Sequence, residues 1–174
     1  DKTIVIQPFG SGFQLDDVAQ NGYDESVRSI SPKTYFQMVK KLSKKYNLVY
    51  MGNIQLNEDT YTIKPQADMR AWISIIATAN YFIGCDSLGQ HISYNVGTPS
   101  SVMLGSTYGI NISYPKTHQI IQKKDAPRQY SPIRLLGFDN NVANAVNEGV
   151  MDFTESEVNT ILEKIESDIK KRAK

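Results

Sequence analysis

The chain has 174 residues, a hydrophobic fraction of 40% and a formal net charge of +1 from 19 basic and 18 acidic residues. This length supports one compact domain with a substantial core, and the balanced charge argues against nucleic acid or an anionic membrane as the main partner. A single cysteine, Cys85, excludes an intrachain disulfide and a cysteine-based zinc site, and with only two histidines no metal site is expected.

The first predicted element is a buried parallel strand over Thr3–Gln7, a β-branched run closed by Pro8. The loop over residues 8–12 (PFGSG) is rich in small residues and contains Ser11. Such a loop can cradle a phosphate, although a simple turn explains it equally well. Residues 13–30 are polar and irregular, and a connection of this length is often functional.

A helix is predicted to start at Ser31 and Pro32, which suit the N-cap and first helical positions, and to run to about residue 45. Residues 47–51 form the next predicted strand, which Gly52 ends, and residues 55–64 are expected to be an edge segment or loop. Asp68 is a candidate cap for a further helix, in which Trp72 is expected to belong to the core.

The central stretch, residues 82–107, predicts a strand, a tight turn, a short helix, a second turn and another strand. The first strand ends at Ile83, and Asp86 lies at the tip of the turn over residues 84–89. The helix is expected over residues 90–96. Gly97, Thr98 and Pro99 stop it, and residues 101–104 form the following strand.

This arrangement has a chemical use, because the first backbone N–H groups of a helix point outward at the positive end of its dipole and suit an anion. Ser87 and Gly89 allow a phosphate to approach closely, and His91 falls in the first helical turn. In parallel sheets, ligands bind outside the carboxyl ends of the strands. The alternative is that Asp86 and Ser87 merely cap the helix.

After the central stretch, residues 108–117 are expected to be a loop, and residues 118–122 and 133–136 are expected to be strands. Thr154 and Glu157 have capping-box spacing and begin the last helix, whose basic end near Arg172 is expected to fray. Strands that alternate with helices predict one α/β domain over residues 1–174, with a Rossmann-like, doubly wound, mostly parallel sheet and helices on both faces.

Asp86, Ser87 and His91, with the following Pro99 and the Gly-Ser-Thr turn at residues 105–107, resemble glycosyltransferase family nine, the lipopolysaccharide heptosyltransferases. The family signature is Asp-(Ser/Thr)-Gly-x-x-His, a helix, a strand that begins at Pro and a Gly-x-Thr-like turn. The resemblance extends from residue 4 to about residue 170. The chain departs from it at the family glycine, where Leu88 stands and a glycine follows one position later.

The resemblance implies one half of a GT-B fold, namely the C-terminal domain that binds the nucleotide diphosphate-sugar. ADP-heptose is the donor best known for the family, and no divalent metal is implied. The residues expected to bind the donor are Ser11, Arg28, Gly52, Asp86, Ser87, Gly89, Gln90 and His91. Arg28 takes the place of a basic residue that the family has before the helix, with Lys33 as the competing candidate and a surface arginine as the alternative. Gly52 would approach the base, and His91 would stabilise the leaving group.

The function implied is donor binding in an enzyme that transfers a sugar to an acceptor hydroxyl of a carbohydrate or glycolipid. The N-terminal, acceptor-binding domain would precede residue 1, so the isolated domain is not expected to be active. The alternative is a non-catalytic binding or interaction domain that kept the fold, which Leu88 favours. A nucleotide-sugar epimerase would need carboxylates placed for proton abstraction, which are not evident here. No membrane span or signal peptide is apparent, so a cytoplasmic location is expected, or a peripheral one through the full-length enzyme.

Overall fold

The computed structural model describes residues 2–15, 22–24, 28–56, 60–105, 107–123 and 151–173. The predicted strand over residues 133–136 lies outside these ranges, as does Ser106 in the second polar turn.

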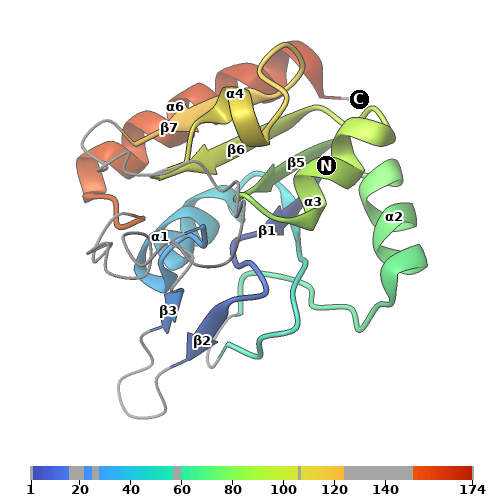
Figure 1. The fold of residues 1–174 in the computed structure, drawn as a ribbon, viewed down its shortest axis with the longest axis horizontal. Coiled ribbons are helices and arrows are strands. Elements are labelled where there is room, and N and C mark those ends of the chain that lie inside the picture. The colour runs from blue at the N-terminus through green and yellow to red at the C-terminus, as the bar shows by residue number, and fades with distance from the viewer. Residues whose placement is uncertain are drawn as a thin grey trace, which may run out of the picture.

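Five parallel strands form the central sheet (Figure 1). In spatial order they are β4 (Asn47–Tyr50), β1 (Thr3–Gln7), β5 (Tyr81–Gly84), β6 (Ser100–Leu104) and β7 (Gln119–Gln122). The first strand of the chain is thus central, because β1 pairs with both β4 and β5. From β1 the chain passes to β4 on one side and then crosses back to β5 on the other side of β1. The direction in which strands are added therefore reverses between β1 and β5, which makes this the topological switch point. The predicted Rossmann-like, parallel α/β sheet is confirmed.

Helices cover both faces of the sheet. The larger core lies between the sheet and two helices, α1 (Pro32–Leu42) and α6 (Glu155–Arg172). The smaller core lies on the other face, under α2 (Met69–Thr78) and α3 (Leu88–Asn95). Alternate residues of one strand enter different cores, because successive side chains point to opposite faces of a strand.

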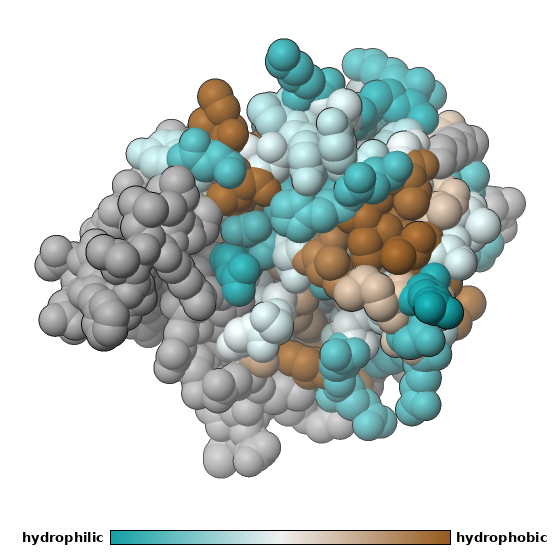
Figure 2. Space-filling model, turned by 45° about the vertical axis from the view of Figure 1, so that its right-hand side comes forward, coloured by the Kyte–Doolittle hydropathy of each residue, from teal (hydrophilic) through white to brown (hydrophobic). Residues whose placement is uncertain are grey.

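In β1, for example, Ile4 and Ile6 pack with α1 and α6, whereas Val5 packs with α2 and α3. Trp72 is 6% exposed and belongs to the smaller core, as predicted. Figure 2 turns the α2 side forward and shows an apolar patch there among hydrophilic side chains; Met69 and Ile73 are exposed on α2.

Local signals set the helix ends as the sequence predicts. The side chains of Ser31, Asp68 and Thr154 each accept a hydrogen bond from a backbone N–H in the first turn of α1, α2 and α6, and the capping box of Thr154 and Glu157 is present. Helix α3 ends at Asn95, and Gly97 follows its C-cap with a φ of 68°, which permits the closing turn. The N–H of Thr98 then bonds the carbonyl of Ser93 at 2.9 Å, as in a Schellman motif.

Three sequence predictions are wrong. The segment expected to be irregular contains an antiparallel hairpin of β2 (Phe13–Leu15) and β3 (Gly22–Asp24). The loop expected after β6 contains the short helix α4 (Gly109–Ile112). The end of α6 is tied to the sheet, because Arg172 donates hydrogen bonds to the carbonyls of Ser100 and Thr117 and to the carboxylate of Asp168.

Two predicted helix boundaries also differ. Helix α1 ends at Leu42 and not near residue 45, whereas α3 begins at Leu88, two residues earlier than expected. No helix within the described ranges is both long and apolar enough to cross a membrane.

Candidate functional site

The candidate site lies where β1 and β5 end side by side, at the topological switch point. Gln7 closes β1 and pairs in register with Gly84 at the end of β5. The N–H of Cys85 then bonds the carbonyl of Gln7 at 3.2 Å. Because the connecting helices leave these two strands toward opposite faces, a crevice is expected here in this class of sheet.

The N-terminus of α3 faces this point and is held by a side chain from β1. The carboxamide oxygen of Gln7 accepts the N–H of Gly89 at 2.7 Å, and its nitrogen donates to the hydroxyl of Ser87 at 3.3 Å. Ser87 occupies the N-cap position but makes no capping hydrogen bond of its own. The interpretation of Asp86 and Ser87 as a simple cap therefore fails for Ser87, and Gln7 provides the acceptor.

Gly89 is required by close packing. A Cβ at this position would lie 2.5 Å from the carboxamide oxygen of Gln7 and 2.5 Å from the ring of Phe82. Leu88, which stands at the family glycine position, is 39% exposed instead. The glycine one position later thus serves the contact between α3 and β1, while Leu88 adds an apolar side chain at the helix start.

Asp86 and Gln90 lie inside the turn. Asp86 is 7% exposed, and its carboxylate accepts a hydrogen bond of 3.1 Å from the amide nitrogen of Gln90. The same nitrogen also donates to the carbonyl of Ile112 at 3.1 Å. The amide oxygen of Gln90 is buried and has no hydrogen-bond partner within the described part of the chain. These two predicted binding residues are thus engaged with each other beneath the start of α3.

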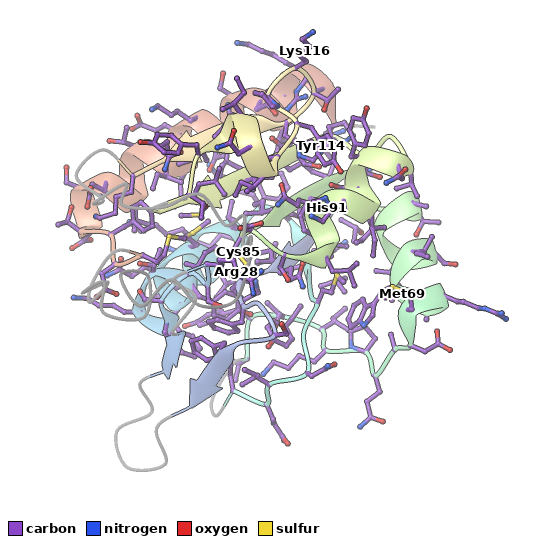
Figure 3. All side chains as sticks on the ribbon, viewed as in Figure 1. Arg28, Met69, Cys85, His91, Tyr114 and Lys116 are labelled. Atoms are coloured by element: carbon purple, nitrogen blue, oxygen red, sulfur yellow. The ribbon has the colours of Figure 1, made fainter. Side chains whose placement is uncertain are left out.

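His91 is exposed on α3 and engages a residue that the sequence does not single out. Its Nδ1 lies 2.9 Å from the hydroxyl of Tyr114, and the two rings meet edge to face. Figure 3 shows His91 near Tyr114 and well separated in the view from Arg28 and Cys85.

The loop after β1 and the segment before α1 are joined at this edge of the sheet. The N–H of Gly10 bonds the hydroxyl of Ser29 at 2.8 Å, and the N–H of Ile30 bonds the carbonyl of Pro8 at 2.7 Å. These bonds hold residues 29 and 30, which follow Arg28, against the loop at the carboxyl end of β1.

Two other candidates are solvent-exposed. Ser11 lies in an exposed turn after β1, and Lys33, the competing basic residue, is exposed on α1.

A pocket of about 430 Å³ opens after β4 and includes the predicted Gly52. Its lining is partly apolar, with Tyr50 and Trp72, and partly polar, with Asn53 and Lys64. The hydroxyl of Tyr50 donates to the carbonyl of Ile54 at 2.9 Å, and this bond holds the turn after β4.

His118 belongs to an aromatic cluster near the start of β7 and is 5% exposed. Its ring meets the rings of Tyr94 and Tyr114 edge to face, and neither ring nitrogen has a hydrogen-bond partner among the residues that the structure describes. Burial lowers the pKa of His118 to about 4, with smaller contributions from the positive charges of Arg172 and His91. Across the described ranges, no three His, Cys, Asp or Glu side chains lie together so that they could hold a metal ion.

The structure therefore brings Ser87, Gly89, Asp86 and Gln90 together at the end of β5 and adds Gln7, which sequence reasoning missed. The available signal was an amide residue at the end of an otherwise apolar strand. Tyr114 was also missed, and its position in a Tyr-Pro loop gives no local signal for its contact with His91.

Sequence comparison finds no protein-family model and no curated protein that matches the chain. Structure comparison does find similar folds. Heptosyltransferase WaaC of E. coli, solved with ADP, superposes with a TM-score of 0.63 at 12% identity, over 96% of this chain and 44% of WaaC.

Glycosyltransferase TibC of enterotoxigenic E. coli, described as iron-containing and dodecameric, gives a TM-score of 0.63 at 12% identity over 99% of this chain and 48% of TibC. TibC in complex with ADP-D-beta-D-heptose gives a TM-score of 0.62 at 11% identity. The chain spans less than half the length of these proteins. Its fold is thus that of a glycosyltransferase-like domain, similar to part of the heptosyltransferases.

Proposed function

We propose that this chain is the donor-binding domain of a heptosyltransferase-like glycosyltransferase, which binds a nucleotide diphosphate-sugar and serves transfer of the sugar to an acceptor hydroxyl. The observation that carries the proposal is the start of α3, which Gln7 holds at the switch point between β1 and β5. Helix N-termini at such points suit phosphate groups. ADP and ADP-heptose in the structurally similar proteins favour an adenine nucleotide.

The chemistry proposed is stabilisation of the diphosphate as it leaves the sugar. Apart from the N–H of Gly89, which bonds Gln7, the N–H groups at the start of α3 would face the negative charge that develops there. The hydroxyl of Ser87 and the guanidinium of Arg28 would face it too, and fixed dipoles of this kind are usually the largest catalytic contribution. Arg28 would bind two phosphate oxygens at once. His91 would add a donor, Ser11 would lie along the phosphates, and the pocket at Gly52 would take the base.

The proposal also includes a second domain of the enzyme. We infer an N-terminal domain that binds the acceptor, a carbohydrate or glycolipid, and completes the cleft; the isolated domain would then bind donor without turning it over. Donor binding would need no metal ion, because N–H groups and Arg28 would neutralise the diphosphate. A cytoplasmic location, or a peripheral one at a membrane, follows from a nucleotide-sugar donor.

The test is calorimetric titration of the domain with ADP, UDP and GDP, without metal and then with magnesium. We expect one diphosphate to bind without metal, and Ser87→Ala and Arg28→Gln each to weaken it about tenfold. Lys40→Gln is the matched control, because Lys40 is an exposed cation near the other end of α1 and should leave the affinity unchanged. Absence of binding by the folded domain would contradict the proposal.

The second candidate function is a non-catalytic interaction domain. The exposed Leu88 favours it, because its side chain stands at the start of α3, where the family has a glycine and a phosphate would approach. Leu88→Gly separates the candidates. If the wild type binds no nucleotide and Leu88→Gly binds none either, the interaction domain is favoured.

A further inference from the structure

His91 and Tyr114 make a well-defined side-chain contact outside the turn over residues 84–89. The two side chains come from different elements, α3 and the loop before β7, and their polar atoms lie 2.9 Å apart. The rings cross at 85° with centroids 5.7 Å apart, so the tyrosine approaches the imidazole edge to face.

Tyr114 is itself held firmly. Its ring stacks on that of Tyr94 with centroids 3.8 Å apart and an angle of 4°, and the ring of His118 packs against it at 5.2 Å. Its backbone carbonyl accepts the N–H of His118 at 2.7 Å. The phenol is therefore a fixed partner for His91, and not a surface group that meets it by chance.

The hydrogen bond at Nδ1 decides what the other ring nitrogen can do, since in a neutral imidazole one nitrogen donates and the other accepts. If the phenol donates to Nδ1, the proton of the neutral ring is on Nε2. We propose that Tyr114 is a positioning residue that donates its hydroxyl proton to Nδ1 of His91 and thereby keeps Nε2 protonated as a hydrogen-bond donor.

This assignment gives His91 a definite role, which rests on the proposed donor-binding function. His91 follows Ser87 by one helical turn, and residues four apart share a helix face. A protonated Nε2 is suited to a phosphate oxygen, whereas a bare Nε2 would repel it. Tyr114 would thus act on donor binding through His91, without touching the nucleotide.

The experiment compares Tyr114→Phe with Tyr94→Phe. The first change removes the hydroxyl that contacts His91; the second removes the hydroxyl of the stacked neighbour and keeps both rings. Nitrogen-15 chemical shifts of His91, measured in the ligand-free domain at a pH where the ring is neutral, report which nitrogen carries the proton. We expect the Nε2–H form in the wild type and Tyr94→Phe, and a mixture of both forms in Tyr114→Phe.

Titration with ADP gives the second readout. We expect Tyr114→Phe to weaken binding about three- to tenfold, the loss of roughly one hydrogen bond. The same change should have no further effect in a His91→Ala background, because Tyr114 acts only through His91. A merely structural role would weaken binding in both backgrounds.

The proposal is overturned if the wild type carries the neutral proton on Nδ1, or if Tyr114→Phe leaves the shifts of His91 unchanged. It is also overturned if ADP binds and Tyr114→Phe has the same affinity as the wild type while His91→Ala is weaker. Failure of the donor-binding function looks different: no nucleotide binds, yet the nitrogen shifts still decide whether Tyr114 orients His91.

Discussion

Gln7 connects two parts of the chain that are 82 positions apart in sequence. One carboxamide satisfies a backbone donor of α3 through its oxygen and fixes the hydroxyl of Ser87 through its nitrogen. Since Ser87 accepts from Gln7, its own proton remains available for another acceptor. The residue thus links the fold to the candidate site, with a side chain that is 7% exposed.

Gln7→Leu keeps the approximate shape of this side chain but leaves the N–H of Gly89 without its acceptor. We expect the free energy of unfolding to fall by about 1–3 kcal/mol, the usual cost of a buried donor left unpaired. Urea denaturation measures this free energy of unfolding. Gln66→Leu, which changes an exposed glutamine, is the control. Equal stability of Gln7→Leu and the wild type would show that the contact contributes nothing.

His118 gives the molecule a pH-dependent stability. Its pKa is about 4 in the folded protein, below the ordinary value of 6.5, because burial disfavours the charged ring. The unfolded chain therefore takes up the proton first as the pH falls, so this stability is present above pH 6.5 and is lost between pH 6.5 and pH 4. The loss is at most about 3 kcal/mol, at 1.36 kcal/mol per unit.

The measurement is the difference in unfolding free energy between the wild type and His118→Leu at several pH values. We expect the difference to shift in favour of the variant as the pH falls through this window. Lys44→Gln, which changes an exposed side chain and leaves both histidines in place, should follow the wild type. A constant difference between the wild type and His118→Leu would contradict the prediction.

At the scale of elements, side-chain hydrogen bonds fix both ends of α6. Its capping box starts it, and its last turn joins a network at the amino ends of β5 and β6. There Asp168 accepts from Arg172 and from the hydroxyl of Tyr81, and this hydroxyl also bonds Ser101 at 2.8 Å. Burial and the bond to Asp168 raise the pKa of Tyr81, so the phenol stays neutral as a donor.

Arg172→Met should lower the free energy of unfolding by roughly 1–3 kcal/mol, because two backbone carbonyls and a carboxylate lose their donor. Lys171→Met changes the neighbouring, exposed cation and should have little effect. Thermal unfolding of both variants at one pH checks this. If the two variants have the same melting temperature, the hydrogen bonds of Arg172 do not stabilise the end of α6.

The elements also show which part of the structure is readable from sequence. The caps Ser31, Asp68 and Thr154 were predicted because each acts within three residues of itself. The turn between β5 and α3 is likewise predicted from its local residues, whereas its role in binding stays a prediction. Gln7 and Tyr114 were not predicted, because their contacts join segments far apart in sequence and leave no local pattern.

At the scale of the whole molecule, the sheet order decides where a ligand would meet the chain. The order β4-β1-β5-β6-β7 places the reversal between β1 and β5, with helices on opposite faces. Alternation of strands and helices predicted the fold class, whereas the neighbours of each strand became known only from the structure. The edge that carries Gln7 and Ser87 follows from that order.

Nucleotide binding should be visible as local protection. With ADP at 100 times its dissociation constant, the free energy of unfolding should rise by about 2.7 kcal/mol. Hydrogen exchange should slow most in the amides of residues 9–10 and 87–90, after the ends of β1 and β5. Protection confined to the last turn of α6, at the amino ends of β5 and β6, would show that the nucleotide binds elsewhere.

The central position of β1 has a consequence for the order of folding during synthesis. In this domain, β1 precedes its neighbour β5, whose Tyr81 pairs with Ile4, and its helical cover is completed by α6. A growing chain therefore carries an open strand edge until much of the domain has been made. Such non-local pairing slows folding and exposes nascent chains to aggregation.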